Sequence, residues 1–174
     1  GTTKTVTLRT NKLSNLKQFQ SNDDNIVGQL DMSGWDNLGG DFRTYSNPLL
    51  TSITHTASTE TFIRYWANSC NLTGNHDMSM LSGLGGSFQI QSNSALTGIT
   101  HTASTEVFNF YAVSSCGLIG NHDVSMFPRL GGSFWGHINP LLTGITHTTS
   151  TEVFSGYYAY SCNLIGNHDV SMFP

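Results

Sequence analysis

Charged residues are scarce in this chain of 174 residues. Only 10% of them are Asp, Glu, Lys or Arg, whereas a typical soluble domain carries about 25%. The net charge is −4 with only seven Lys and Arg, so the chain lacks the basic stripe that nucleic-acid binding requires. No run approaches the roughly 18 apolar residues of a membrane-spanning helix. These absences argue against a nucleic-acid partner and against membrane insertion.

What the chain has instead is a repeat. Between residues 25 and 162 the sequence repeats every 46 residues, and each repeat divides into two similar units of 23 residues. Asn and Cys alternate at one position of the unit, giving Asn47, Cys70, Asn93, Cys116, Asn139 and Cys162. Five residues earlier in each unit stands an aromatic residue, giving Phe42, Tyr65, Phe88, Tyr111, Phe134 and Tyr157. A fixed period in this range predicts a solenoid, in which each coil buries its apolar face against its neighbours.

The period also predicts the state of the three cysteines. Cys70, Cys116 and Cys162 lie two coils apart, which corresponds to roughly 9–10 Å at about 4.8 Å per coil. A disulfide requires Cα atoms within about 7 Å of each other. We therefore expect three buried free thiols, which behave as small hydrophobic groups and give no evidence about the redox compartment.

The unit around Asn93 shows how one coil is built. Phe88 and Ile90 alternate with polar residues, which indicates a strand with one buried face. Asn93 then turns the chain, and Leu96 and Ile99 return to the interior. The same order recurs in six successive units: apolar strand residues, an Asn or Cys at a fixed position, and then a Leu. This pattern resembles that of the leucine-rich repeat family. The resemblance covers about residues 16–166.

The resemblance implies an α/β-type repeat solenoid that is right-handed, with one parallel sheet and about seven coils. The chain departs from the family pattern in its aromatic strand residues and in its convex segments, such as residues 100–106, which contain too much Thr and Ser for firm helix. We therefore expect a mostly β solenoid with little regular helix. The family pattern also gives the alternating Asn and Cys a role as a structural spine, because an amide at a turn can satisfy backbone groups of two coils.

Residues 1–24 fit the period poorly, and we interpret them as a degenerate N-terminal cap coil, which solenoids need for solubility. Phe19 takes the aromatic position and Asp24 the spine position, while residues 5–10 alternate like an edge strand. The solenoid is expected over residues 25–174. It comprises repeats at 25–70, 71–116 and 117–162 and a truncated repeat at 163–174. The truncation suggests a fragment or one end of a longer array.

Differences between the copies are concentrated in the strands. Between residues 71–116 and 117–162, nine of ten strand positions differ, whereas only nine of the other 36 do. Alternate strand residues point outward, and Trp, Tyr and Arg on a rigid sheet are typical of recognition hot spots. The row expected to point inward varies as well, which leaves the assignment of the two faces open. The predicted ligand-binding face comprises Arg43, Tyr45, Arg64, Trp66, Asn68, Gln89, Gln91, Trp135, His137, Tyr158 and Tyr160.

Six of the seven histidines are also periodic, and each alternates with apolar residues along its row. One row contains His76, His122 and His168, and the other contains His55, His101 and His147. Imidazoles on adjacent coils, with an Asp beside each His of the first row, could in principle bind zinc or copper. The apolar neighbours favour neutral histidines that are packed and hydrogen-bonded at core or half-buried positions. We therefore predict no metal site and no cofactor.

Periodicity argues against catalysis, because an active site is a singular arrangement of reactive groups and nothing in this chain is singular. We predict a non-enzymatic recognition module of the adhesin or receptor-binding type. The resemblance extends to bacterial and phage surface proteins, so we expect an extracellular, cell-surface or virion-surface location. The ligand is expected to be a protein or a glycan on another surface. The alternative is a structural spacer or filament segment that associates end to end.

Overall fold

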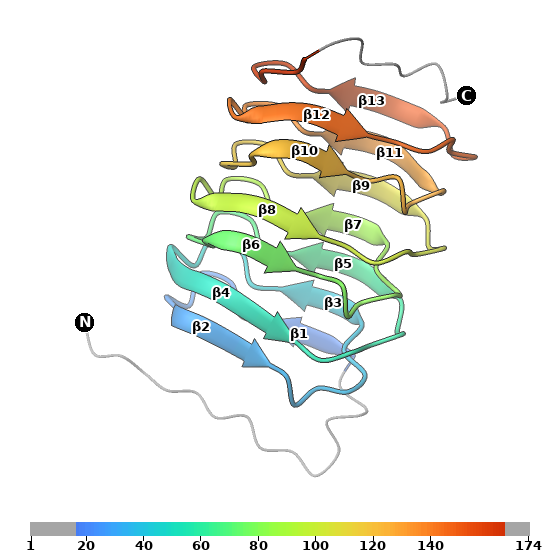
Figure 1. The fold of residues 1–174 in the computed structure, drawn as a ribbon. Coiled ribbons are helices and arrows are strands. Elements are labelled where there is room, and N and C mark those ends of the chain that lie inside the picture. Colours follow the sequence, from blue (N-terminus) through green and yellow to red (C-terminus); the bar gives the residue numbers. More distant parts are fainter. Residues whose placement is uncertain (1–16, 166–174) are drawn as a thin grey trace.

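The computed structural model describes residues 17–165, which form a right-handed solenoid of parallel strands (Figure 1). Within residues 17–165, thirteen strands make six complete turns and begin a seventh. The prediction of a mostly β solenoid with little regular helix is confirmed. The described residues contain no helix, so none of them belongs to a helix long enough to cross a membrane. The edge strand expected at residues 5–10, His168 and most of the truncated repeat lie outside the described residues.

Each coil contributes one strand to a long parallel sheet, the main sheet. Its strands follow the order β1-β3-β5-β7-β9-β11-β13, so each inner strand pairs with the strands one coil before and after it. The bounds are Gln18–Gln20 for β1, Gly40–Arg43 for β3, Phe62–Trp66 for β5, Gly86–Gln89 for β7, Phe108–Ala112 for β9, Leu130–Trp135 for β11 and Phe154–Tyr158 for β13. The pairing keeps the period of 23 residues, because Tyr65 lies opposite both Phe42 and Phe88.

The opposite side of the solenoid, the paired face, consists of three two-stranded parallel sheets. They join β2 to β4, β6 to β8 and β10 to β12, with bounds Val27–Met32, Leu49–His55, Gly74–Asp77, Leu96–Thr100, Gly120–Asp123 and Leu142–Thr146 in chain order. The sequence predicted one parallel sheet, and the structure adds these three. Because no ladder joins β4 to β6 or β8 to β10, the repeat of 46 residues corresponds to a pair of coils.

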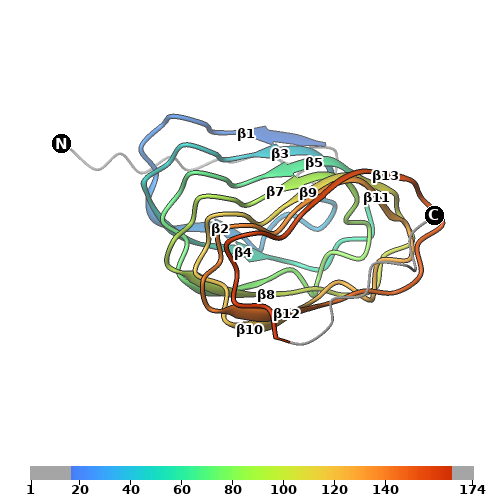
Figure 2. The same cartoon turned by 90° about the horizontal axis from the view of Figure 1, so that it is seen from above.

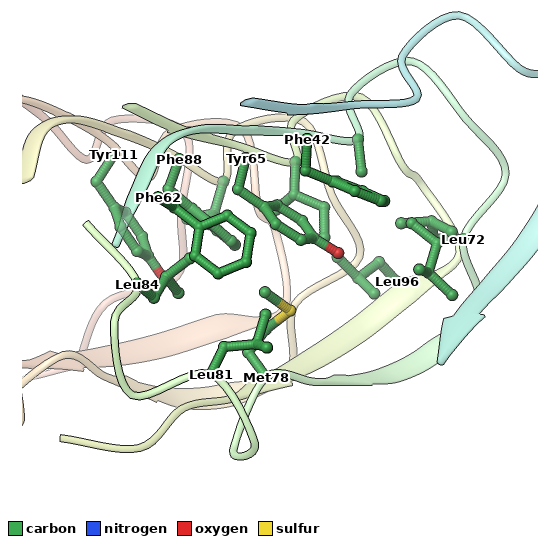
Figure 3. Close-up of a cluster of buried hydrophobic side chains, with 14 of the residues drawn as sticks. Phe42, Phe62, Tyr65, Leu72, Met78, Leu81, Leu84, Phe88, Leu96 and Tyr111 are labelled. Carbon is green, nitrogen blue, oxygen red and sulfur yellow. The ribbon is translucent and has the colours of Figure 1, made fainter. Parts of the chain in front are cut away.

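Seen from above, the strands of the main sheet and those of the paired face lie on opposite sides of the solenoid (Figure 2). A column of stacked aromatic rings lies in the core between the two faces (Figure 3). Centroids of consecutive rings lie 4.7 to 5.6 Å apart along the series Phe19, Phe42, Tyr65, Phe88, Tyr111, Phe134 and Tyr157. Stacked rings stabilise a core beyond the apolar area that they bury. Each aromatic ring thus contacts its counterpart in the next coil.

A buried asparagine stabilises the turn after every second main-sheet strand. The Asn93 Nδ2 donates to the carbonyls of Ala67 and Ile90 at 3.0 and 2.7 Å, and its Oδ1 accepts from the amide of Leu72 at 3.0 Å. Asn47 and Asn139 make equivalent bonds. One amide therefore satisfies three backbone groups that belong to two coils.

The alternate spine position holds a cysteine that bonds more weakly. The Cys116 thiol lies 3.5 Å from the carbonyl oxygen of Ile90, and burial raises its pKa to about 11. All three thiols are free, with Cys70 and Cys116 buried and Cys162 half-buried. The prediction of free thiols is therefore confirmed.

Replacing Asn93 with Ala should lower the free energy of unfolding by about 3 kcal/mol or more, because each buried backbone group left without a partner costs roughly 1–3 kcal/mol. Cys116→Ala is the matched control, and should cost about 1 kcal/mol because it removes a weak donor and little volume. Urea denaturation of the three proteins measures both effects. Equal losses in the two variants would contradict the structural difference between amide and thiol.

Candidate functional site

The outer surface of the main sheet carries all eleven residues of the predicted binding face. One row across the strands follows the register from Arg43 through Trp66, Gln89, Ala112 and Trp135 to Tyr158. A second row is joined by backbone hydrogen bonds between neighbouring coils and contains Tyr45, Asn68, Gln91, Ser114, His137 and Tyr160. The intervening row is buried at Thr44, Ala67, Ile90, Val113 and Gly136. The assignment of inward and outward positions is therefore settled as the sequence predicted.

Near the N-terminal end of the sheet, two guanidinium groups surround one indole. Arg43 and Arg64 form ion pairs with Asp41 at 2.6 and 2.9 Å. Their guanidinium carbons lie 5.0 and 5.6 Å from the centroid of Trp66, within the range of cation–π attraction. The ring of Tyr45 lies 6.1 Å from that of Trp66. These five residues form the Arg–Trp cluster, and sequence reasoning missed only Asp41.

In the middle of the face, the outward side chains are uncharged and most are smaller than those of the Arg–Trp cluster. Gln89 donates from Nε2 to the Ser87 hydroxyl at 3.1 Å, and Gln91 donates to Gln89 Oε1 at 3.3 Å. Ala112 and Ser114 point outward but are buried, because their side chains are small and larger neighbours flank them. Asn68 is half-buried and its amide bonds to Ser69 at 3.4 Å. This stretch separates the Arg–Trp cluster from a second group.

The second group is the aromatic cluster, which comprises Phe110, Trp135, His137, Tyr158 and Tyr160. The ring of Trp135 lies 5.0 Å from Phe110 and 6.1 Å from Tyr158, and His137 stacks on Tyr160 at 4.6 Å. Tyr158 and Tyr160 are 44% and 57% exposed. Burial lowers the pKa of His137, which favours the uncharged imidazole. Sequence reasoning missed Phe110, which belongs to a third outward row with Asp41 and Arg64.

Ile138, which borders this cluster, has a strained backbone. Its φ is 57°, in the left-handed region that a β-branched residue rarely adopts. The residue before the spine position has positive φ in every coil from Ser46 to Ser161, and the other five residues are serines: Ser46, Ser69, Ser92, Ser115 and Ser161. Comparison of the six copies would have revealed Ile138 as the exception, although not its φ.

A separate set of polar side chains lies buried between the two faces. The Tyr111 hydroxyl lies 2.7 Å from the Nε2 of His101 and 2.8 Å from the Nε2 of His122. Tyr65 makes the same two contacts with His55 and His76 at 2.8 and 2.9 Å. We refer to each set as a His–Tyr–His cluster. The interpretation of these histidines as packed and hydrogen-bonded is confirmed, and the tyrosine partner is what the sequence did not reveal.

The hydrogen bonds assign the protons within each His–Tyr–His cluster. A hydroxyl has one proton to donate, so one imidazole donates to the tyrosine oxygen and the other accepts from it. The Nδ1 of His101 is buried without a hydrogen-bond partner, and an unpaired buried N–H is rarer than an unpaired acceptor. We therefore assign the proton of His101 to Nε2, which donates to Tyr111, and the tyrosine O–H donates to His122.

Burial keeps these groups neutral. It lowers the pKa of His55 to about 3 and those of His76 and His122 to about 4, and it raises those of Tyr65 and Tyr111. None of these imidazoles therefore titrates near pH 7. Across residues 17–165, no group of three or more His, Cys, Asp or Glu side chains is arranged to hold a metal ion. The clusters act as polar core contacts between coils.

No protein-family model, curated protein or solved structure matches the chain. The structure establishes a β-solenoid with coils of 23 residues. The resemblance to leucine-rich repeats is supported by the sequence pattern alone.

Acid should destabilise the solenoid well above the pH at which carboxylates protonate. The unfolded chain binds a proton at each histidine below about pH 6.5, whereas native His76 and His122 bind none until about pH 4. Stability is therefore full above pH 6.5 and falls as the pH is lowered toward 4, by up to about 3 kcal/mol for each of these two groups. Urea denaturation at a series of pH values measures this loss.

His122→Leu provides the control, because Leu30 occupies the equivalent position in the first coil. The Tyr111 hydroxyl keeps His101 as a partner in this variant. The dependence of unfolding free energy on pH should become shallower by about one proton. An unchanged slope would show that His122 is not neutral in the native protein.

Ile138→Ser should raise the free energy of unfolding by about 1 kcal/mol, because it relieves left-handed strain at an exposed position. The reverse change in the preceding coil, Ser115→Ile, should lower the free energy of unfolding by a similar amount. Thermal and urea denaturation of the two variants check both signs. A destabilised Ile138→Ser protein would mean that the isoleucine side chain contributes more packing than its exposure indicates.

Proposed function

We propose that the protein is a non-enzymatic recognition module that binds a protein or glycan ligand through the outer face of the main sheet. The observation that carries this proposal is the location of the variable residues. Differences between copies are concentrated in the main-sheet strands, where they change the outward rows of side chains, whereas the aromatic column, the asparagine turns and the His–Tyr–His clusters are kept from one 46-residue repeat to the next. A varied surface on a constant frame is the usual organisation of repeat binding proteins.

The chemistry of the face supports recognition rather than a passive surface. The Arg–Trp cluster and the aromatic cluster present Arg, Trp and Tyr, the residue types that dominate binding hot spots. A surface under no constraint would favour Ser, Thr, Lys and Glu. Five of the seven described strands of the main sheet are paired on both sides. Their side chains are therefore held in place before a ligand arrives, which limits the entropy lost on binding.

We further propose that the solenoid is an atypical member of the leucine-rich repeat family. The buried asparagine, which bonds to backbone groups of two coils, supports this relationship, and so does the leucine that follows each spine position. On the same basis we propose an adhesin or receptor-binding role on an extracellular, cellular or virion surface. The low charge and the Thr-, Ser- and Asn-rich coils fit that setting.

Replacing Trp66, Trp135 and Tyr158 together with Ser should abolish binding and leave the fold intact, because all three side chains point away from the core. Glycan arrays and binding to cell surfaces provide the readout, and circular dichroism checks the fold. The matched control replaces exposed apolar residues outside the main sheet, Val27, Leu49 and Met80, with Ser.

Loss of binding in both variants would point to non-specific adhesion through exposed apolar groups. Absence of binding by the unmodified chain, together with length-dependent self-assembly, would instead support a spacer or filament segment.

A further inference from the structure

We infer that the aromatic cluster, extended by Ile138, is the main contact surface of the molecule, and that it binds an uncharged, apolar segment of a partner protein. This inference rests on the proposed function, and it adds a location and a ligand class to it.

The strained backbone at Ile138 is the first observation that supports this inference. Five serines occupy the equivalent turn positions at similar φ values, so serine suffices for the turn. Ile138 gains little burial in exchange for its strain, because its side chain remains 45% exposed. Strained residues are retained where function requires the side chain. An exposed isoleucine in this conformation indicates a contact with a partner.

Ile138 is continuous with the aromatic cluster. It follows His137 in the chain, and its amide donates to the Tyr160 carbonyl at 3.0 Å. Beyond the turn, Leu141 is 56% exposed and accepts through its carbonyl from the amide of Gly120 at 3.1 Å, which brings exposed Ile119 alongside. Apolar surface thus extends from the sheet around the turn.

The three copies differ in this combination. The middle repeat has Gln89, Gln91 and Ser92 where the last repeat has Trp135, His137 and Ile138. The first repeat has exposed apolar residues beside the turn, but its outer face carries the charged Arg–Trp cluster and its turn has Ser46. Only the last repeat therefore joins an aromatic sheet surface to an aliphatic turn.

Charge argues for an uncharged partner. The segments that build this surface contain no Asp, Glu, Lys or Arg, and they are residues 108–121, 130–146 and 153–165. A charged ligand would find no counter-ion here and would lose hydration on binding. Exposed Ile and Leu beside Trp and Tyr are typical of the apolar centre of a protein–protein interface, whereas a sugar would meet few groups to bond its hydroxyls at the aliphatic turn.

Two polar atoms within the cluster lack partners. The indole Nε1 of Trp135 and the Nδ1 of His137 are buried and form no hydrogen bond. Unsatisfied buried groups are rare in folded proteins. A peptide backbone offers both a carbonyl acceptor and an amide donor, and so could satisfy both atoms after small movements of the neighbouring Tyr158 and Tyr160 rings.

The test replaces one repeat's surface with that of its neighbour. The variant carries Trp135→Gln, His137→Gln and Ile138→Ser, which are the residues of the middle repeat, so the fold is expected to accept them. The matched control carries Arg43→Gln and Tyr45→Gln, which places the same residues on the first repeat. The probe is a displayed library of random peptides selected on the full chain, and affinities of the enriched peptides are then measured by calorimetry.

We expect the enriched peptides to be uncharged and rich in aliphatic and aromatic residues. Their affinity should fall about tenfold or more in the Trp135, His137 and Ile138 variant and stay within about twofold in the control. Ile138→Ser alone should weaken binding although it raises stability, a combination that a purely structural role does not produce.

Other outcomes overturn the inference in distinguishable ways. Affinity lost only in the control would place the contact surface at the Arg–Trp cluster. Binding of neutral oligosaccharides on a glycan array, in place of peptides, would change the ligand class. Both outcomes leave the proposed function standing. Dimerisation of the chain that the first variant abolishes would make a second copy the occupant. Failure of the unmodified chain to bind peptides, glycans or cells would overturn the inference and the proposed function together.

Discussion

The contact on which the rest of the structure depends is the stacking of one aromatic ring per coil. Neighbouring strands lie about 4.8 Å apart, and ring centroids at 4.7 to 5.6 Å match that spacing, so the column and the backbone ladder reinforce one register. A slip of a single residue would turn the rings to solvent and the outer rows to the core. The alignment of Trp66 with Arg43 and of Trp135 with Tyr158 on the outside is therefore a consequence of ring stacking on the inside.

The tyrosines in this column introduce a second constraint, because a buried hydroxyl must be hydrogen-bonded. Tyr111 takes one imidazole from ten residues before it and one from eleven residues after it, in the next 23-residue unit, which explains why His and apolar residues alternate along two rows. The first coil is consistent with this requirement for a hydrogen-bonded hydroxyl. It has Phe19 and Leu30 at the positions of tyrosine and histidine in later repeats, so the hydroxyl and its partner are absent together.

The sequence predicted the features that the period alone determines. These are the coil length, the inward aromatic row, the outward rows and the free thiols, since each follows from stacking identical units. Features that depend on the cross-section of a coil were not predictable. The contact between Tyr111 and His122 crosses the core between two faces, and the break between β8 and β10 has no marker in composition. Asp41 was not identified because its role depends on two arginines, Arg43 on its own strand and Arg64 on the neighbouring one.

The pairing of coils on one face sets the step by which such an array can change length during evolution. Duplication or loss of 46 residues preserves every ladder of the paired face and both partners of each tyrosine. Loss of a single 23-residue coil, such as residues 71–93, would set Ile99 beside Tyr65 in place of His76. Selection would then remove arrays that had gained or lost an odd number of coils, so related arrays should differ by even numbers of coils. Each gain would add two strands, and therefore one new segment of the outer surface.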